Sequence, residues 1–211
     1  MNTILSILPL KSILLVAAAL AGLSAAQAQE QLSRSEALKY AFIVSANLGE
    51  MLQTPIPTDP DVKRPVAARE GEYGVMVLPE TKLNLAAFAK PGKEGVAVAQ
   101  LWLLKLAPMS DGQPVPAGKL RMVGVTSEEG DAKVPCCALG VRKQPDGDEL
   151  ELLVYGKDKK PVLTVPLKSI SRPQENVVDM VAERKDDGGL LTLRFLGKYE
   201  ASFMVTDPDQ Y

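Results

Sequence analysis

Hydrophobic and polar side chains alternate along most of this chain, and that period of two is the feature that most restricts its fold. In several runs between residues 74 and 205 the apolar side chains recur at every second position, as at Leu150, Leu152 and Val154. Such a pattern is typical of strands with one face against a core and the other toward solvent. Turn-forming sequences such as Asp146-Gly147 separate the runs.

The alternation predicts about nine strands with no helical stretch between them. Their ranges are 74–79, 82–89, 95–106, 119–126, 134–142, 149–155, 161–167, 176–183 and 189–205, the last long enough for a pair. Short strands with regular turns indicate a single antiparallel β-sandwich or open barrel rather than alternating β-α units. The hairpin over residues 149–167 is the most clearly marked, because the charged residues 157–160 keep its tip solvated.

A helix is predicted before the strands. Ser33 and Glu36 have the spacing of a capping box, and an apolar stripe follows over residues 34–52, although residues 40–44 alone would also suit a strand. Prolines then crowd residues 54–61, and a helix cannot pass through them. The predicted organisation is a helical segment over 29–53, a Pro-rich linker or wrapping loop over 54–72, and a β domain over 73–211.

The first 28 residues have the pattern of a cleaved signal peptide. An uncharged apolar run follows Lys11, and Ala26-Gln27-Ala28 matches the small-x-small pattern that precedes a cleavage site. The run is shorter than the ~20 residues that a spanning helix needs, which favours cleavage between Ala28 and Gln29 over an uncleaved anchor. We therefore expect a protein of the periplasm or cell exterior, with no membrane span in the mature chain.

Composition excludes several functions. The chain has 24 basic and 26 acidic side chains, which gives no electrostatic reason to expect a nucleic-acid partner, and it has no histidine. Without histidine, a Ser-His-Asp or Cys-His arrangement and any imidazole metal site are impossible. The Ser-x-x-Lys, nucleophile-elbow, phosphate-loop, dinucleotide-binding and Cys-x-x-Cys patterns are absent as well.

Cys136 and Cys137 are adjacent, which is unusual in an exported chain. Neighbouring α-carbons are about 3.8 Å apart, too close for an ordinary disulfide. Three interpretations remain: one cysteine packs in the core while the other lies near the surface, the pair forms a strained vicinal disulfide with a redox role, or two thiolates hold a soft metal such as copper(I). Pro135 cannot donate a ladder hydrogen bond, so we expect a strand edge or bulge here, with at least one accessible sulfur.

A second candidate site is the turn that contains Asp146, Asp148 and Glu149. Three carboxyl groups close together could bind calcium, but the order of residues lacks the EF-hand pattern. The alternative is a plain hairpin turn in which Gly147 takes a positive φ angle.

Two classes of function follow from these observations. The missing catalytic signatures favour a non-catalytic binding or structural module with a protein or glycan partner, and with no cofactor unless calcium or copper binds at the two candidate sites. The alternative is a carboxylate-dependent hydrolase of polysaccharide or cell-wall material, which needs only two acidic side chains about 5 to 10 Å apart.

Overall fold

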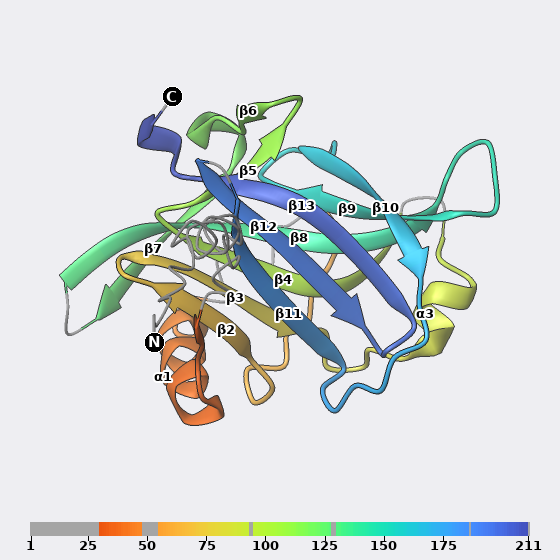
Figure 1. The fold of residues 1–211 in the computed structure, drawn as a ribbon, viewed down its shortest axis with the longest axis horizontal. Helices are drawn as coiled ribbons and strands as arrows, with labels where there is room; N and C mark the ends of the chain where they lie inside the picture. The colour runs from red at the N-terminus through yellow and green to blue at the C-terminus, as the bar shows by residue number, and fades with distance from the viewer. Residues whose placement is uncertain (1–29, 48–54, 93–94, 128–129, 186, 211) are drawn as a thin grey trace, which may run out of the picture.

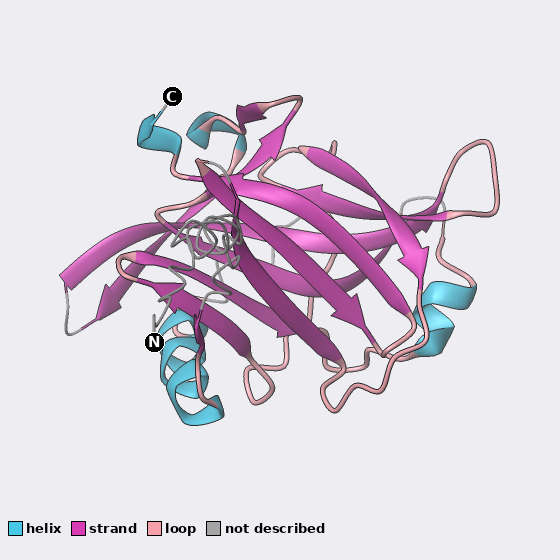
Figure 2. Ribbon diagram, in the orientation of Figure 1, coloured by secondary structure: helices cyan, strands magenta, loops and turns pink. Residues whose placement is uncertain are grey.

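The computed structural model describes residues 30–47, 55–92, 95–127, 130–185 and 187–210, so the predicted leader over 1–28 lies outside the described residues. One antiparallel sheet curls until it is nearly closed into a barrel, and a helix precedes it (Figure 2). The predicted mainly β fold with a preceding helix is confirmed. In the described part of the chain, no helix has the length and apolar character needed to cross a membrane.

The elements follow the chain in the order shown in Figure 1. The strands are β1 (Glu30–Gln31), β2 (Val66–Glu70), β3 (Tyr73–Pro79), β4 (Val96–Leu104), β5 (Ala107–Ser110), β6 (Gln113–Pro114), β7 (Arg121–Ser127), β8 (Gly130–Lys143), β9 (Leu150–Tyr155), β10 (Leu163–Ser169), β11 (Val178–Lys185), β12 (Gly188–Phe195) and β13 (Tyr199–Thr206). The helices are α1 (Arg34–Ser45) and α3 (Leu85–Ala89), with 3₁₀ turns η1 (Ala117–Lys119) and η2 (Pro208–Gln210).

The sheet order is β1-β2-β3-β4-β8-β9-β10-β13-β12-β11. Eight antiparallel pairings lie between β2 and β11, so these two strands run in the same direction and cannot close the barrel by another antiparallel ladder. The short strand β1 covers the outer edge of β2 instead, and an ion pair between Glu70 and Arg184 at 3.6 Å joins the two ends. Because both partners are exposed, this pair adds at most about 1 kcal/mol.

The inner face of the sheet encloses the main core. Every strand on the path from β2 to β11 contributes alternate apolar side chains to it, among them Leu101 and Leu103 of β4 and Leu191 and Leu193 of β12, all fully buried. Phe88 of α3 belongs to the same core, stacked on Tyr199 with ring centroids 4.7 Å apart. The interior is therefore filled by side chains, as expected for a small barrel.

The outer face of β2, β3, β4, β7 and β8 carries a second core beneath α1. Ala37, Ala41 and Val44 of the helix pack on it, and Trp102 of β4 is only 2% exposed there. The capping box is confirmed, with the Ser33 backbone N–H donating to the Glu36 carboxylate at 3.0 Å. The α1 helix ends at Ser45, and residues 48–52 of the predicted helix lie outside the described residues.

The described part of the proline-rich segment is a loop that lies on the outer face of the barrel. Ile56 packs against Leu153 and Tyr155, while Thr58 accepts a hydrogen bond from the buried Gln100 amide at 2.8 Å. The same amide accepts from the Trp102 ring N–H at 3.3 Å. The wrapping loop is thus the form that this segment takes, although β2 falls inside the range 54–72 that the sequence assigns to it.

The strand predicted over residues 82–89 is wrong, because residues 85–89 form the helix α3. Asn84 is its N-cap, and its side-chain oxygen accepts from the Ala86 N–H at 2.8 Å. Leu83 is buried but Leu85 is 51% exposed, so their alternation does not reflect one buried face of a strand. The helix-favouring run of alanines and the cap decide the local structure here.

Candidate functional site

The two cysteines do not form an exposed pair. Both lie within β8 as free thiols, with Cys136 in the outer core beneath α1 and Cys137 in the barrel interior. The relative exposure of each residue is 0%, so the expectation that at least one sulfur is accessible is wrong, and so is a near-surface place for the second cysteine. Successive side chains of a strand point to opposite faces, and in this molecule both faces are covered.

The expectation of a strand edge holds for Pro135, which lies beyond the last pair on the β4 side of β8, but it is wrong for the two cysteines, which both pair with β4. Cys136 pairs with Trp102 of β4 on one edge of β8 and with Arg121 of β7 on the other. Pro135 ends only the β4 ladder, whose last pair is Trp102 with Cys136, while the β7 ladder continues past it. A proline in a strand lacks one donor, and losing that donor on one edge leaves the other edge free to pair.

Burial makes both thiols poor nucleophiles and poor metal ligands in the folded protein. Burial raises the pKa of Cys137 to about 12, and burial together with the neighbouring Cys137 raises the pKa of Cys136 well above its ordinary value. A thiol must lose its proton before it binds a metal or attacks a disulfide. Over the residues that the structure describes, no three Cys, Asp or Glu side chains form a group able to hold a metal ion.

The acidic turn after β8 lies in solvent. Asp146, Asp148 and Glu149 are all exposed, and the Lys143 ammonium lies 2.7 Å from a carboxylate oxygen of Asp148. This lysine lowers the pKa of Asp148 through its hydrogen bond and its charge. Gly147 does not have a positive φ, so the expected role of this glycine in the turn is wrong. A calcium ion at this turn would compete with the Lys143 ammonium for Asp148.

One buried carboxyl group was not singled out by the sequence. Glu80 follows β3 and is 9% exposed, and one of its oxygens accepts from the Asp59 backbone N–H at 2.7 Å. Its other oxygen has no hydrogen-bond partner among the described residues. Burial raises the pKa of Glu80, as does the nearby Asp59 carboxylate, while the Asp59 hydrogen bond opposes them. This carboxyl group attaches the wrapping loop to the barrel and does not line either of the hollows described below.

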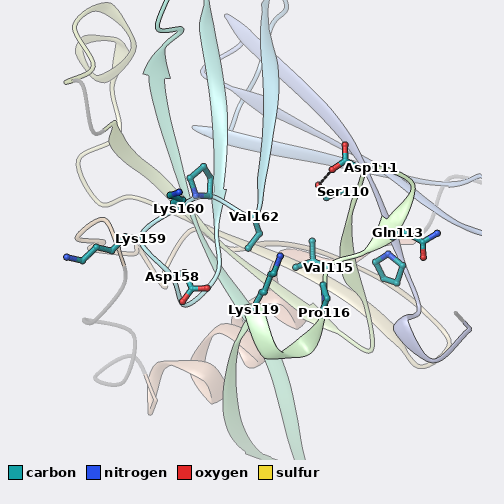
Figure 3. A pocket seen from close by; sticks show the side chains of 12 residues that line it. Ser110, Asp111, Gln113, Val115, Pro116, Lys119, Asp158, Lys159, Lys160 and Val162 are labelled. Carbon is teal, nitrogen blue, oxygen red and sulfur yellow. Dashed lines mark hydrogen bonds between the residues drawn. The ribbon is translucent and has the colours of Figure 1, made fainter.

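A groove of about 650 Å³ lies between the β5–β6 turn and the β9–β10 turn (Figure 3). One wall contains Ser110, Asp111, Gln113, Pro114, Val115 and Pro116, and the other contains Asp158, Lys159, Lys160, Pro161 and Val162, with Lys119 between them. In Figure 3 the Lys119 side chain rises between Val115 and Val162, whereas Lys159 extends outward from its turn. Within the described ranges, none of these three lysines forms an ion pair.

Backbone contacts hold the two sides of the groove together. The Lys157 N–H donates to the Lys119 carbonyl at 3.1 Å. A Cβ atom on Gly156 would stand 2.1 Å from the same carbonyl oxygen, so this close approach requires glycine. Asp111 and Gly112 at the β5–β6 turn both have positive φ angles, 53° and 75°. The groove is therefore shaped by backbone geometry and by prolines.

A smaller hollow, of about 330 Å³, lies where the two ends of the sheet approach each other. Gln31, Leu32, Arg34, Arg64, Pro65, Val66, Glu175, Asn176 and Val177 line it. Arg64 is already bound to Asp61 at 2.6 Å and to the Thr81 carbonyl at 3.2 Å. This hollow marks the incomplete closure of the barrel, and one of its two arginines is occupied.

Comparison of the chain with models of protein families, with curated proteins and with solved structures finds no match.

Proposed function

We propose that this chain is an exported, non-catalytic binding module of the periplasm or cell exterior, and that its ligand lies in the groove between the β5–β6 and β9–β10 turns. The main support is the contrast between the interior and the surface. Apolar side chains fill the interior of the barrel, so a ligand must bind outside it. The groove is the larger of the two hollows described above, and it combines three prolines with lysines that have no ion-pair partner in the described chain.

The groove suits binding better than hydrolysis. Asp111 and Asp158 lie on opposite walls and both are exposed. A glycosidase holds its general acid in a desolvated environment that keeps the proton on the carboxyl group at neutral pH. Neither carboxyl group has such an environment, since Asp111 is exposed and accepts from the neighbouring Ser110 hydroxyl at 3.2 Å.

The location of the site can be tested by blocking it. Ser110→Trp would place a large side chain on one wall of the groove, and Thr126→Trp would place the same side chain on the exposed part of β7. We expect a glycan array and a pull-down screen to identify ligands of the wild-type protein, and binding of these ligands to be lost in Ser110→Trp but kept in Thr126→Trp. Circular dichroism confirms that each variant is folded. Binding that survives in a folded Ser110→Trp variant would contradict this location.

A further inference from the structure

The charges in the groove point to a particular class of ligand, and this inference rests on the proposed binding function. Lys119 and Lys160 line the groove together with Asp111 and Asp158, and Lys159 extends outward beside it, which leaves a small excess of positive charge in and around the groove. The chain as a whole has a net charge of −2. A locally positive groove on a negatively charged protein favours an anionic group at this place rather than at random over the surface.

The same charges limit how highly charged the ligand is. A densely sulfated or phosphorylated polymer would bring several negative groups close to Asp111 and Asp158, and like charges repel. A polymer with one carboxylate per sugar has a lower charge density, and its carboxylates can contact the lysines while the two aspartates contact its hydroxyl groups. Lysine presents a compact charge and does not require the planar two-oxygen geometry that arginine favours.

The other groove residues favour a sugar chain over a peptide. Pro114, Pro116 and Pro161 have no backbone N–H, so the groove wall lacks the row of donors that a bound peptide strand needs. Ser110, Asp111 and Gln113 gather at one side and can hydrogen-bond to hydroxyl groups. Among the described residues, no aromatic side chain lines the groove, so neutral sugars lack the usual stacking platform there, and the lysines must supply most of the affinity.

We propose that the groove binds an acidic polysaccharide of the polyuronate type, with Lys119 and Lys160 contacting its carboxylates. Lys119 lies at the centre of the groove, where its backbone is held by the β9–β10 turn. Lys160 extends the positive charge along one wall. A ligand with regularly repeated carboxylates contacts both lysines at once, so each contact raises the effective concentration for the other.

The test compares two polymers of the same backbone. Oligomers of polygalacturonate carry the carboxylates, and their methyl esters lack the charge. We expect the purified protein to bind the acid form, to bind the methyl ester at least about tenfold more weakly, and to lose affinity as sodium chloride is raised. Isothermal titration calorimetry measures the affinity for each polymer and its dependence on salt. Equal affinity for the two polymers would overturn the proposed charge recognition.

Two matched double variants locate the contacts. Lys119→Gln with Lys160→Gln removes two charges from the groove, whereas Lys133→Gln with Lys168→Gln removes two from exposed positions on β8 and β10. We expect the groove variant to bind polygalacturonate at least about tenfold more weakly, and the control variant to stay within about threefold of the wild type. Equal losses in both variants would show a nonspecific charge effect and overturn the proposal.

Failure of this inference differs from failure of the proposed function. A neutral glycan that binds in the groove and is blocked by Ser110→Trp would leave the binding function standing and refute the polyuronate. Tighter binding of dextran sulfate or of a single-stranded oligonucleotide than of polygalacturonate would refute the low-charge sugar ligand. Ligands that bind Ser110→Trp as well as the wild type would refute only the location of the site, whereas the absence of any ligand of the wild-type protein would refute the binding function itself.

Discussion

The Glu80 carboxylate accepts a hydrogen bond from the backbone N–H of Asp59 at 2.7 Å, and this bond joins the wrapping loop to the end of β3. Thr81 strengthens the junction, since its backbone N–H donates to the Asp59 carbonyl at 2.8 Å. The buried carboxyl group therefore lies at a place where its protonation state affects how firmly the loop is held.

Protonation of Glu80 is expected to make stability depend on pH. Burial raises its pKa above the ordinary value of 4.5, so the folded state holds this proton more tightly than the unfolded state. The stability that it contributes is fully present below pH 4.5 and is lost as pH rises through the raised pKa of the folded protein. The Glu80→Gln variant cannot ionise at this position, so it removes the loss of stability at high pH. Its amide oxygen can still accept the hydrogen bond from the Asp59 backbone N–H.

Urea unfolding of the wild type and Glu80→Gln at pH 4 and pH 8 measures this effect. We expect the free energy of unfolding of the variant to rise relative to the wild type between the two pH values. Taking the difference between the two proteins cancels the contribution of the other titrating groups. A difference that is the same at both pH values would show that Glu80 is ionised normally in the folded state.

The buried cysteines are expected to be unreactive but important for packing. Alkylation at pH 8 without denaturant should label neither Cys136 nor Cys137, and intact mass should correspond to two free thiols. Since both residues are fully buried, replacing both with serine places two hydroxyl groups in apolar cores, at a cost of about 2 to 6 kcal/mol. The adjacency of the two cysteines in the sequence would by itself predict almost no loss of stability on replacement, because a disulfide between neighbouring residues closes no long loop.

Mass spectrometry and chemical unfolding test these expectations. Replacement of both cysteines with alanine is the control, because alanine leaves a small void at each site but no unpaired hydroxyl group, so it should cost less than serine. Rapid labelling of the native protein, or an unchanged unfolding midpoint in the serine variant, would contradict the buried positions.

Gly156 is expected to tolerate no side chain. Its substitution by alanine would bring a Cβ atom to 2.1 Å from the Lys119 carbonyl oxygen, so the backbone must move and the groove must widen. We expect Gly156→Ala to lower the free energy of unfolding by about 2 kcal/mol or more and to weaken ligand binding in the groove. At Gly147 the nearest atom would be 3.9 Å from an added Cβ, so Gly147→Ala is the matched control. Equal stabilities of the two variants, measured by thermal unfolding, would refute the close contact.

The same substitution at two helices should have very different effects. Phe88 of α3 is 2% exposed and lies against Phe195 and Tyr199, whereas Phe42 of α1 is 80% exposed. Phe88→Ala should therefore cost about 3 to 5 kcal/mol, and Phe42→Ala less than about 0.5 kcal/mol. Urea unfolding compares the two. A small loss at Phe88 would mean that α3 is not anchored in the core as described.

Local patterns explain why much of the fold could be predicted. Alternation in Leu150, Leu152 and Val154 correctly predicts β9, because side chains of a strand alternate between its two faces, although Leu153 and Tyr155 on the other face are buried as well. Ser33 and Glu36 mark the start of α1, since the capping box is formed by residues only three apart. These features depend on neighbours in the chain, so the sequence carries them directly.

The sites depended on the tertiary structure. Cys136 on the outer face of β8 lies in the core beneath α1, and Ile56 of the wrapping loop covers Ala138 on the same face, so these surroundings follow from elements distant in the chain. Leu83 and Leu85 show the opposite case, where alternation occurs by chance at the start of a helix. The groove brings Lys119 beside residues 158–162, which no local pattern relates to it. Side-chain periodicity is encoded between near neighbours, whereas burial and a binding surface arise from contacts between distant segments, and these form only when the barrel folds.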